Sequence, residues 1–180
     1  MKIVVLTGSP HERGTTAYLA DKFCEGAEES GHETHRFDVG KMNVKPCLGC
    51  DYCLKNDGEC VYSDDMIKIQ PYLLESDAVV FVTPLYYFGI TAQLKSVIDR
   101  FYAVNEKLRN KSKKACLITA GSNSDKWAVE GIFAHFKTIC RYLKWEKYGE
   151  IFIPGAATRE DVENTIYAEE VKNLGRDIEN

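Results

Sequence analysis

The sequence predicts an α/β domain built on a doubly wound, five-stranded parallel sheet with helices on both faces. Two observations predict it: five short apolar runs alternate with segments of helical periodicity, and each connection is long enough for a crossover helix. Right-handed crossovers place helices on both sides of such a sheet. No internal repeat or linker interrupts the pattern, so residues 1–180 are predicted to form a single domain. The expected strands cover residues 3–6, 34–39, 78–83, 115–119 and 148–153.

The helices are expected where apolar residues recur three or four positions apart and share one face. A shorter helix is predicted over residues 65–75, with Ser63 or Asp64 as its N-terminal cap. The longer faces consist of Leu19, Phe23 and Ala27; Ile90, Leu94, Val97 and Phe101; Ile132, Phe136, Ile139 and Leu143; and Tyr167, Val171, Leu174 and Ile178.

The composition is that of a globular protein and excludes several classes of function. Hydrophobic residues make up 44% of the 180 residues, and the formal net charge is −4 with no basic face, so a nucleic-acid partner is not expected. The chain opens on a strand rather than a signal peptide. Its longest apolar stretch, residues 78–92, is broken by Pro84 and Gly89, so no membrane contact is expected. We therefore expect a cytoplasmic protein, whose seven cysteines are thiols or metal ligands rather than disulfides.

The segment from Gly8 to Thr16 is the most informative part of the chain. It follows the apolar run 3–6 and leads into a helical pattern, so a small, hydroxyl-rich loop meets a helix N-terminus. Unpaired N–H groups and partial positive charge at such an end suit a phosphate. The loop lacks a lysine after its last glycine, and its glycines do not fit Gly-x-Gly-x-x-Gly, which excludes two common nucleotide motifs. The alternative is an ordinary turn with Thr15 as N-cap.

Two further loops are expected beside the first, because ligands of open parallel sheets bind beyond the carboxyl ends of the strands. Residues 84–89 place three consecutive aromatic residues between Pro84 and Gly89, and residues 120–124 are small and polar. Aromatic side chains at a strand end suit a flat ring system. The alternative is that one or two of these aromatic residues cap the core or line a dimer interface. We expect the loop to serve both purposes, ring binding and packing of this kind, at once. A phosphate at one loop and a flat heterocycle at the next describe a mononucleotide such as FMN.

Four segments together resemble a known family. They are Gly8-Ser9-Pro10 with Gly14-Thr15-Thr16, Asp77-Ala78 through Thr83-Pro84-Leu85-Tyr86, Ala92-Gln93-Leu94-Lys95, and Ile98-Asp99-Arg100-Phe101. This joint pattern is similar to the NADPH-dependent FMN reductase family of flavodoxin-like proteins, and the resemblance covers nearly the whole chain. It implies the strand order 2-1-3-4-5, bound FMN, and a homodimer or higher homo-oligomer.

The resemblance also implies which residues contact FMN. The phosphate is expected to be surrounded by Ser9, His11, Thr15 and Thr16. The isoalloxazine ring is expected to contact Pro84, Leu85, Tyr86, Tyr87 and Gly89, with its other side closed by Ala120 and Gly121. No side chain is predicted to be catalytic, because the flavin carries the chemistry.

The irregular segment 40–62 holds a second constellation, which we call the cysteine quartet: Cys47, Cys50, Cys53 and Cys60. The segment is longer than its crossover requires, and compact cysteine spacing lets thiolates converge on one centre. The spacing resembles that of the iron–sulfur flavoproteins, a branch of the same family, which implies a [4Fe–4S] cluster. Free or redox-active thiols and a zinc site are the alternatives. The remaining cysteines are expected in the core: Cys24, Cys116 and Cys140.

The sequence therefore predicts an FMN-dependent oxidoreductase that passes electrons from NAD(P)H to a small acceptor: a quinone, a nitro or azo compound, a metal ion or a flavin. The alternative is an iron–sulfur flavoprotein or a flavodoxin-type carrier, which exchanges single electrons with protein partners such as a ferredoxin-like donor. A receiver domain is excluded because Thr83-Pro84 stands where an acidic residue is needed. A low-molecular-weight phosphatase is excluded because the first loop has no cysteine.

Overall fold

Five parallel strands form one sheet in the predicted order, β2-β1-β3-β4-β5. The structure is a computed structural model that describes residues 1–179. Ile3 of β1 lies opposite Thr34 on one side and Ala78 on the other. The switch point of the sheet is therefore at β1 and β3, where ligands of such folds bind. The strands are β1 (Lys2–Thr7), β2 (Glu33–Phe37), β3 (Ala78–Pro84), β4 (Lys114–Ala120) and β5 (Glu146–Ile153).

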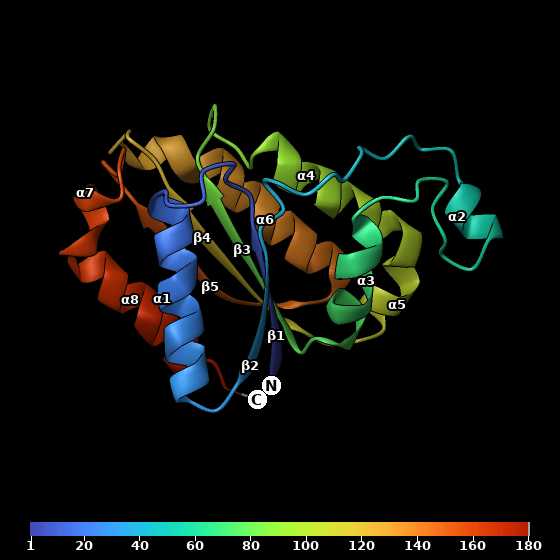
Figure 1. Cartoon of the computed structure of the whole chain (residues 1–180), viewed down its shortest axis with the longest axis horizontal. Helices are drawn as coiled ribbons and strands as arrows, with labels where there is room; N and C mark the ends of the chain where they lie inside the picture. Colours follow the sequence, from blue (N-terminus) through green and yellow to red (C-terminus); the bar gives the residue numbers. More distant parts are fainter. Residues whose placement is uncertain (180) are drawn as a thin grey trace.

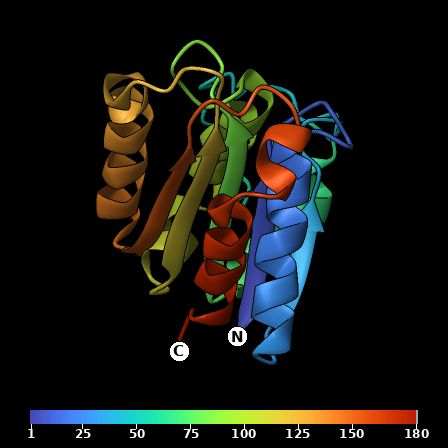
Figure 2. The same cartoon turned by 90° about the vertical axis from the view of Figure 1, so that its left-hand side faces the viewer.

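Helices cover both faces of the sheet (Figures 1 and 2). Figure 2 shows two of them, α1 and α8, side by side on one face, with α6 on the other. No helix within residues 1–179 combines the length and apolar character that a membrane crossing requires. The first face carries α1 (Thr15–Glu29), α7 (Glu160–Glu163) and α8 (Ile166–Arg176). The second carries α3 (Met66–Glu75), α4 (Ala92–Asp99), η1 (Arg100–Val104), α5 (Asn105–Arg109), η2 (Lys126–Val129) and α6 (Glu130–Leu143).

Alternation along the strands divides their side chains between two cores. Val4 and Leu6 of β1 pack in the core under α3, α4 and α6. Ile3 and Val5 pack in the core under α1 and α8. All four side chains are fully buried, as expected for a parallel sheet covered on both faces. The central strands are thus a rigid base from which the loops at their carboxyl ends project.

Some element boundaries differ from the predicted ones. β2 ends at Phe37 rather than at residue 39, because the chain turns there and the Val39 N–H donates to the Phe37 carbonyl at 3.0 Å. The apolar face of residues 90–101 divides between α4 and the 3-10 turn η1. Thr15 as N-cap is wrong: Gly14 holds the N-cap position of α1, and no side chain caps that helix.

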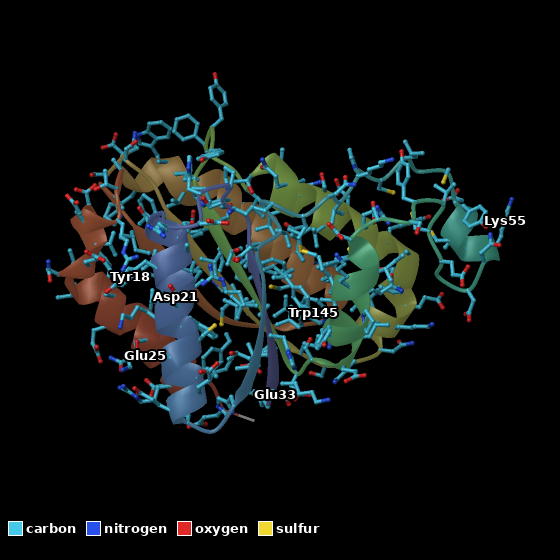
Figure 3. The ribbon with its side chains drawn as sticks, in the orientation of Figure 1. Tyr18, Asp21, Glu25, Glu33, Lys55 and Trp145 are labelled. Atoms are coloured by element: carbon cyan, nitrogen blue, oxygen red, sulfur yellow. The ribbon has the colours of Figure 1, made fainter. Side chains whose placement is uncertain are left out.

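The cysteine-rich excursion, residues 40–62, leaves the body of the domain and contains one short helix, α2 (Tyr52–Lys55). Figure 1 shows α2 at one end of the long axis of the molecule and α7 at the other. Figure 3 shows the same arrangement: Lys55 of α2 and Tyr18 of α1 lie toward opposite ends of the view. The cysteine quartet and the start of α1 therefore lie toward opposite ends of the domain.

Candidate functional site

A cavity of about 720 Å³ lies at the carboxyl ends of the strands. It is bordered by the loops that follow β1, β3, β4 and β5. The structure brings nine of the eleven predicted FMN contacts to its wall: Ser9, His11, Thr15, Thr16, Pro84, Leu85, Tyr86, Ala120 and Gly121. Three loops that are far apart in the sequence thus meet at one site, as the switch-point argument requires.

The first turn of α1 forms one end of the cavity. Tyr18 is the first residue whose N–H pairs within the helix, with the Gly14 carbonyl at 3.2 Å. Among the described residues, the backbone N–H groups of Thr15, Thr16 and Ala17 have no acceptor. The turn also contains no acidic side chain. Free N–H groups and the positive end of the helix dipole together fit a phosphate.

Basic side chains border the same end of the cavity. His11, Arg13 and Arg159 all line it. The Arg159 guanidinium lies 4.8 Å from the centre of the Tyr18 ring. Glu12 also lines the cavity, but its carboxylate pairs with Lys41. Arg159 pairs with Glu163 at 2.5 Å, whereas Arg13 has no carboxylate partner among residues 1–179, so the charge of Arg13 favours an anion at this end.

The opposite wall is apolar and is held by backbone hydrogen bonds. The Leu85 N–H donates to the Ala120 carbonyl at 2.8 Å, which joins the loop after β3 to the end of β4. The Gly121 N–H donates to the Ile153 carbonyl at 3.2 Å. A Cβ atom at Gly121 would lie 3.1 Å from the Leu85 Cβ, so a glycine allows the two loops to approach closely. This wall suits the edge and face of a flat ring.

Beyond Tyr86, the loop after β3 makes a tight two-residue turn, Tyr87 and Phe88, which does not line the cavity. Tyr86 and Gly89 exchange both backbone hydrogen bonds, at 3.2 and 3.1 Å. Tyr87 and Phe88 between them have φ values of 46° and 65°, a left-handed conformation that costs non-glycine residues free energy. The Tyr87 side chain is 98% exposed, and the Phe88 ring lies 5.0 Å from the Trp127 ring.

Consequently, two predicted FMN contacts, Tyr87 and Gly89, are not among the residues that line the cavity. The positive φ values of the turn direct Tyr87 into solvent, and Gly89 closes the turn behind it. The aromatic residues were predicted to serve both a ring-binding site and an interface, and the structure separates them. Tyr86 belongs to the cavity wall, whereas Tyr87 and Phe88 form an exposed aromatic surface with Trp127.

Sequence reasoning missed the fourth wall of the cavity, residues 156–159 after β5. Asp161 holds this loop, because its carboxylate accepts the N–H groups of Ala157 at 3.0 Å and Thr158 at 2.7 Å. These hydrogen bonds lower the pKa of Asp161 below its usual value. Topology could have identified this loop. It follows a parallel strand, and the carboxyl end of that strand lies at the same edge of the sheet as the other three loops.

The cysteine quartet borders a second, small cavity of about 20 Å³, room for about one water molecule. Cys47 and Cys50 are exposed, while Cys53 and Cys60 are half-buried. Burial raises the pKa of the Cys53 thiol. Four thiols around one cavity are the donor chemistry that an iron–sulfur cluster requires. Over residues 1–179, however, no three His, Cys, Asp or Glu side chains are close enough to hold a metal ion.

The remaining cysteines occupy the core or its border. Cys116 and Cys140 are buried, and burial raises their pKa values to about 12 and about 11. Cys24 is half-buried and packs against the core under α1. These three thiols are therefore packing residues, as predicted, and the quartet is distinct from them in position.

Comparisons with known proteins agree with this fold. An iron–sulfur flavoprotein of Archaeoglobus fulgidus is 36% identical over 123 residues, which is 67% of this chain and 56% of that protein. An iron–sulfur flavoprotein of Methanocaldococcus jannaschii is 33% identical over 125 residues, 68% of this chain and 64% of that protein. The chain thus spans between about half and two-thirds of the length of these relatives.

Two solved structures show the same fold at low identity. The NAD(P)H:quinone oxidoreductase of Methanothermobacter marburgensis has a TM-score of 0.76 at 19% identity, covering 100% of this chain and 96% of that one. An azoreductase from Bacillus anthracis has a TM-score of 0.73 at 18% identity, covering 99% of this chain and 100% of the other. The model of the NADPH-dependent FMN reductase family matches residues 1–144, which include three of the four loops around the large cavity. This chain therefore belongs to the NADPH-dependent FMN reductase family.

Proposed function

We propose that the chain binds FMN in the large cavity and passes electrons from NAD(P)H to a small acceptor. The acceptor class is a quinone, a nitro or azo compound, a metal ion or a free flavin. One observation carries the proposal: the cavity joins the free N–H groups at the start of α1 to an apolar wall at Leu85 and Tyr86. Its volume of about 720 Å³ lies in the range of cofactor sites.

The residues divide into two groups by the part of FMN that they would hold. Ser9 and Thr16 are almost fully buried and offer hydroxyl donors to the phosphate, and Arg13 adds a charge. Pro84, Leu85 and Tyr86 cover one side of the ring, and Ala120 and Gly121 close the other. FMN, when bound, supplies a ring that takes up a hydride and releases its two electrons to an acceptor. The protein's part is to position that ring and to keep water from its covered face.

An anaerobic preparation tests the proposal directly. The protein should bind about one FMN per chain, should oxidise NADPH or NADH, and should reduce a quinone such as menadione with retention of the flavin. A protein that takes up no FMN from solution would contradict the proposal as a whole. A protein that holds FMN but does not accept hydride from either nicotinamide would instead be a carrier of single electrons.

The cysteine quartet supports a second candidate function, an iron–sulfur flavoprotein that exchanges electrons with a ferredoxin-like protein. The observation in its favour is that all four cysteine residues line one cavity although Cys47 and Cys60 are thirteen positions apart. Two relatives that bear this name are 36% and 33% identical to the chain over the matched residues. Iron and acid-labile sulfide in the protein after anaerobic reconstitution would establish this function. Their absence would mean that FMN is the only redox cofactor of the chain.

We also propose a cytoplasmic homo-oligomer. The aromatic surface of Tyr87, Phe88 and Trp127 is 98%, 42% and 54% exposed, and such surfaces are usually covered by a partner. A second copy of the chain is the proposed partner, because the surface follows directly along the chain from Tyr86, which lines the large cavity. Seven free thiols are consistent with a reducing compartment.

A further inference from the structure

The first loop of the large cavity, residues 8–16, packs against the segment that follows β2. The Gly40 N–H donates to the Thr7 carbonyl at 3.1 Å, just before the loop begins. A Cβ atom at Gly40 would overlap the Ser9 carbonyl and would lie 2.8 Å from the Pro10 nitrogen. Only a glycine allows two backbone segments to approach so closely. The segment after β2 therefore has a fixed position against this loop.

Lys41, the next residue along the chain, reaches the first loop with its side chain. Its ammonium pairs with the Glu12 carboxylate. Both residues also line a small cavity of about 10 Å³ between the loop and the end of β2. Glu12 lines the large cavity as well, whereas Lys41 does not. The ammonium therefore reaches the Glu12 carboxylate from outside the proposed FMN site.

Glu12 is the acidic residue that an anion in the large cavity would meet. Among the described residues that line this cavity, it alone carries a carboxylate. The same loop supplies Arg13 and leads to the free N–H groups of Thr15 and Thr16. An unpaired carboxylate at this place would repel the phosphate that those groups attract.

The Lys41–Glu12 ion pair is specific, because the neighbouring charges are already matched. The Arg36 Nε donates to Asp38 Oδ1 at 2.8 Å, and the Arg36 Nη1 pairs with Asp21. In the part of the chain that the structure describes, Lys41 and Glu12 have no ion-pair partner besides each other. Removal of the Lys41 ammonium would therefore leave the Glu12 carboxylate unpaired.

We propose that Lys41 is a positioning residue that makes the large cavity selective for a phosphorylated flavin. Its ammonium neutralises Glu12, so the first loop offers Arg13 and the free N–H groups of α1 without a competing negative charge. Lys41 does not touch the flavin and acts through Glu12. This inference rests on the proposed binding of FMN. It adds to that binding a residue outside the cavity, at the start of the cysteine-rich excursion.

Lys41→Met tests the proposal by fluorescence titration with FMN and with riboflavin, which lacks the phosphate. The side chains of Lys41 and Glu12 are 38% and 70% exposed, so the effect is that of an exposed ion pair. At low ionic strength the variant should bind FMN about two- to fivefold more weakly than the parent does, and should bind riboflavin equally well. Added salt should reduce the loss, because ions screen exposed charges.

Three further variants test whether Lys41 acts through Glu12. Glu12→Gln in the Lys41→Met background should restore the affinity for FMN, because no carboxylate is then left to repel the phosphate. Lys41→Arg should bind FMN like the parent, because it keeps a positive charge beside Glu12. The matched control is Lys95→Met, which removes an exposed ion pair with Asp99 on α4 and should change neither affinity.

The outcomes separate failure of this inference from failure of the proposed function. A parent protein that binds neither flavin would overturn both. A parent that binds FMN, with a Lys41→Met variant of equal affinity, would overturn the role of Lys41 alone. Equal losses for FMN and riboflavin would also overturn it, because they would show a purely structural effect. A loss for FMN that Glu12→Gln does not restore would refute the action through Glu12.

Discussion

The Thr91 hydroxyl donates a hydrogen bond to the Gly8 carbonyl at 2.9 Å, and this buried bond ties the end of β1 to the start of α4. The same oxygen accepts the Leu94 N–H at 3.4 Å and so caps α4. Gly8 opens the loop at the end of the cavity where we propose that the phosphate binds, and Thr91 follows the loop that holds Leu85 and Tyr86. One threonine thus fixes the spacing between the two ends of the proposed FMN site.

Gly8→Ala should disturb that spacing. A Cβ atom at position 8 would lie 2.5 Å from Thr91 Oγ1 and 2.9 Å from the Leu94 Cβ. We expect a loss of about 1–3 kcal/mol in the free energy of unfolding, together with weaker FMN binding. Urea unfolding and fluorescence titration with FMN measure the two effects. Gly131→Ala is the control, because its new Cβ meets only the Phe88 carbonyl oxygen at 3.5 Å, an ordinary contact; in helix α6 it should not lower the free energy of unfolding, and it should leave FMN binding unchanged. A stable Gly8→Ala variant would show that the loops are not held by this contact.

Ser9→Ala and Thr16→Ala should each weaken FMN binding by about 1–3 kcal/mol, the scale of a hydrogen bond to a charged group. Both side chains line the cavity beside the free N–H groups of α1. Riboflavin, which lacks the phosphate, provides the control ligand, and its affinity should change much less. Calorimetric titration of both flavins against each variant makes the comparison. Equal losses for FMN and riboflavin would place these hydroxyls away from the phosphate.

The sheet and three of its loops could be predicted because each rests on local signals. Buried strands such as 78–83 are continuous apolar runs, and the loops after them carry glycine, proline or hydroxyl residues. No local sequence signal identified residues 156–159 as part of the cavity wall. Their position depends on contacts with Tyr18 and Gly121, two residues that are distant from them in the sequence. The direction of Tyr87 was equally inaccessible, since it depends on a pair of left-handed backbone conformations that aromatic residues rarely adopt.

Asp161→Ala should loosen the wall that sequence reasoning missed. Its carboxylate holds Ala157 and Thr158 through backbone N–H groups and also accepts the Thr158 hydroxyl at 3.0 Å. Without it, the loop should become more mobile, and FMN should dissociate faster with little change in its association rate. Stopped-flow release of FMN measures the effect. Glu160→Ala, an exposed change on the same helix, should behave like the parent. Unchanged release from Asp161→Ala would exclude this loop from the FMN site.

Tyr87→Ala should weaken self-association while leaving FMN bound. The side chain is almost fully exposed and does not line the cavity, so its removal affects the aromatic surface more than the pocket. Sedimentation velocity at micromolar concentration should show an oligomer for the parent and a shift toward monomer for the variant. The control is Tyr142→Ala, an exposed aromatic residue on α6 that pairs with Asn105 rather than with this surface. A monomeric parent with FMN bound would contradict the proposed interface.

Lys113 makes stability depend on pH from the edge of the sheet opposite the cavity. It stands just before β4, is 2% exposed, and its Nζ donates to the carbonyls of Leu74 and Ser76 at the end of α3. Burial lowers the pKa of this ammonium from 10.5 to about 8. Below pH 8 both the folded and the unfolded chain hold the proton, so the full penalty of a buried charge is present. Between pH 8 and 10.5 the unfolded chain binds more protons than the folded one, and stability rises with pH.

Lys113→Met removes this proton linkage. The difference in unfolding free energy, parent minus variant, should therefore increase with pH between about 8 and about 10.5, by an amount on the order of 3 kcal/mol. Thiols and tyrosines also titrate in that range, but they are the same in both proteins and cancel in the difference. Urea unfolding in steps of one pH unit makes the measurement, with Lys107→Met, an exposed lysine on α5, as the control. A constant difference across that range would mean that Lys113 keeps its proton in the folded chain, held by the three oxygen atoms around it.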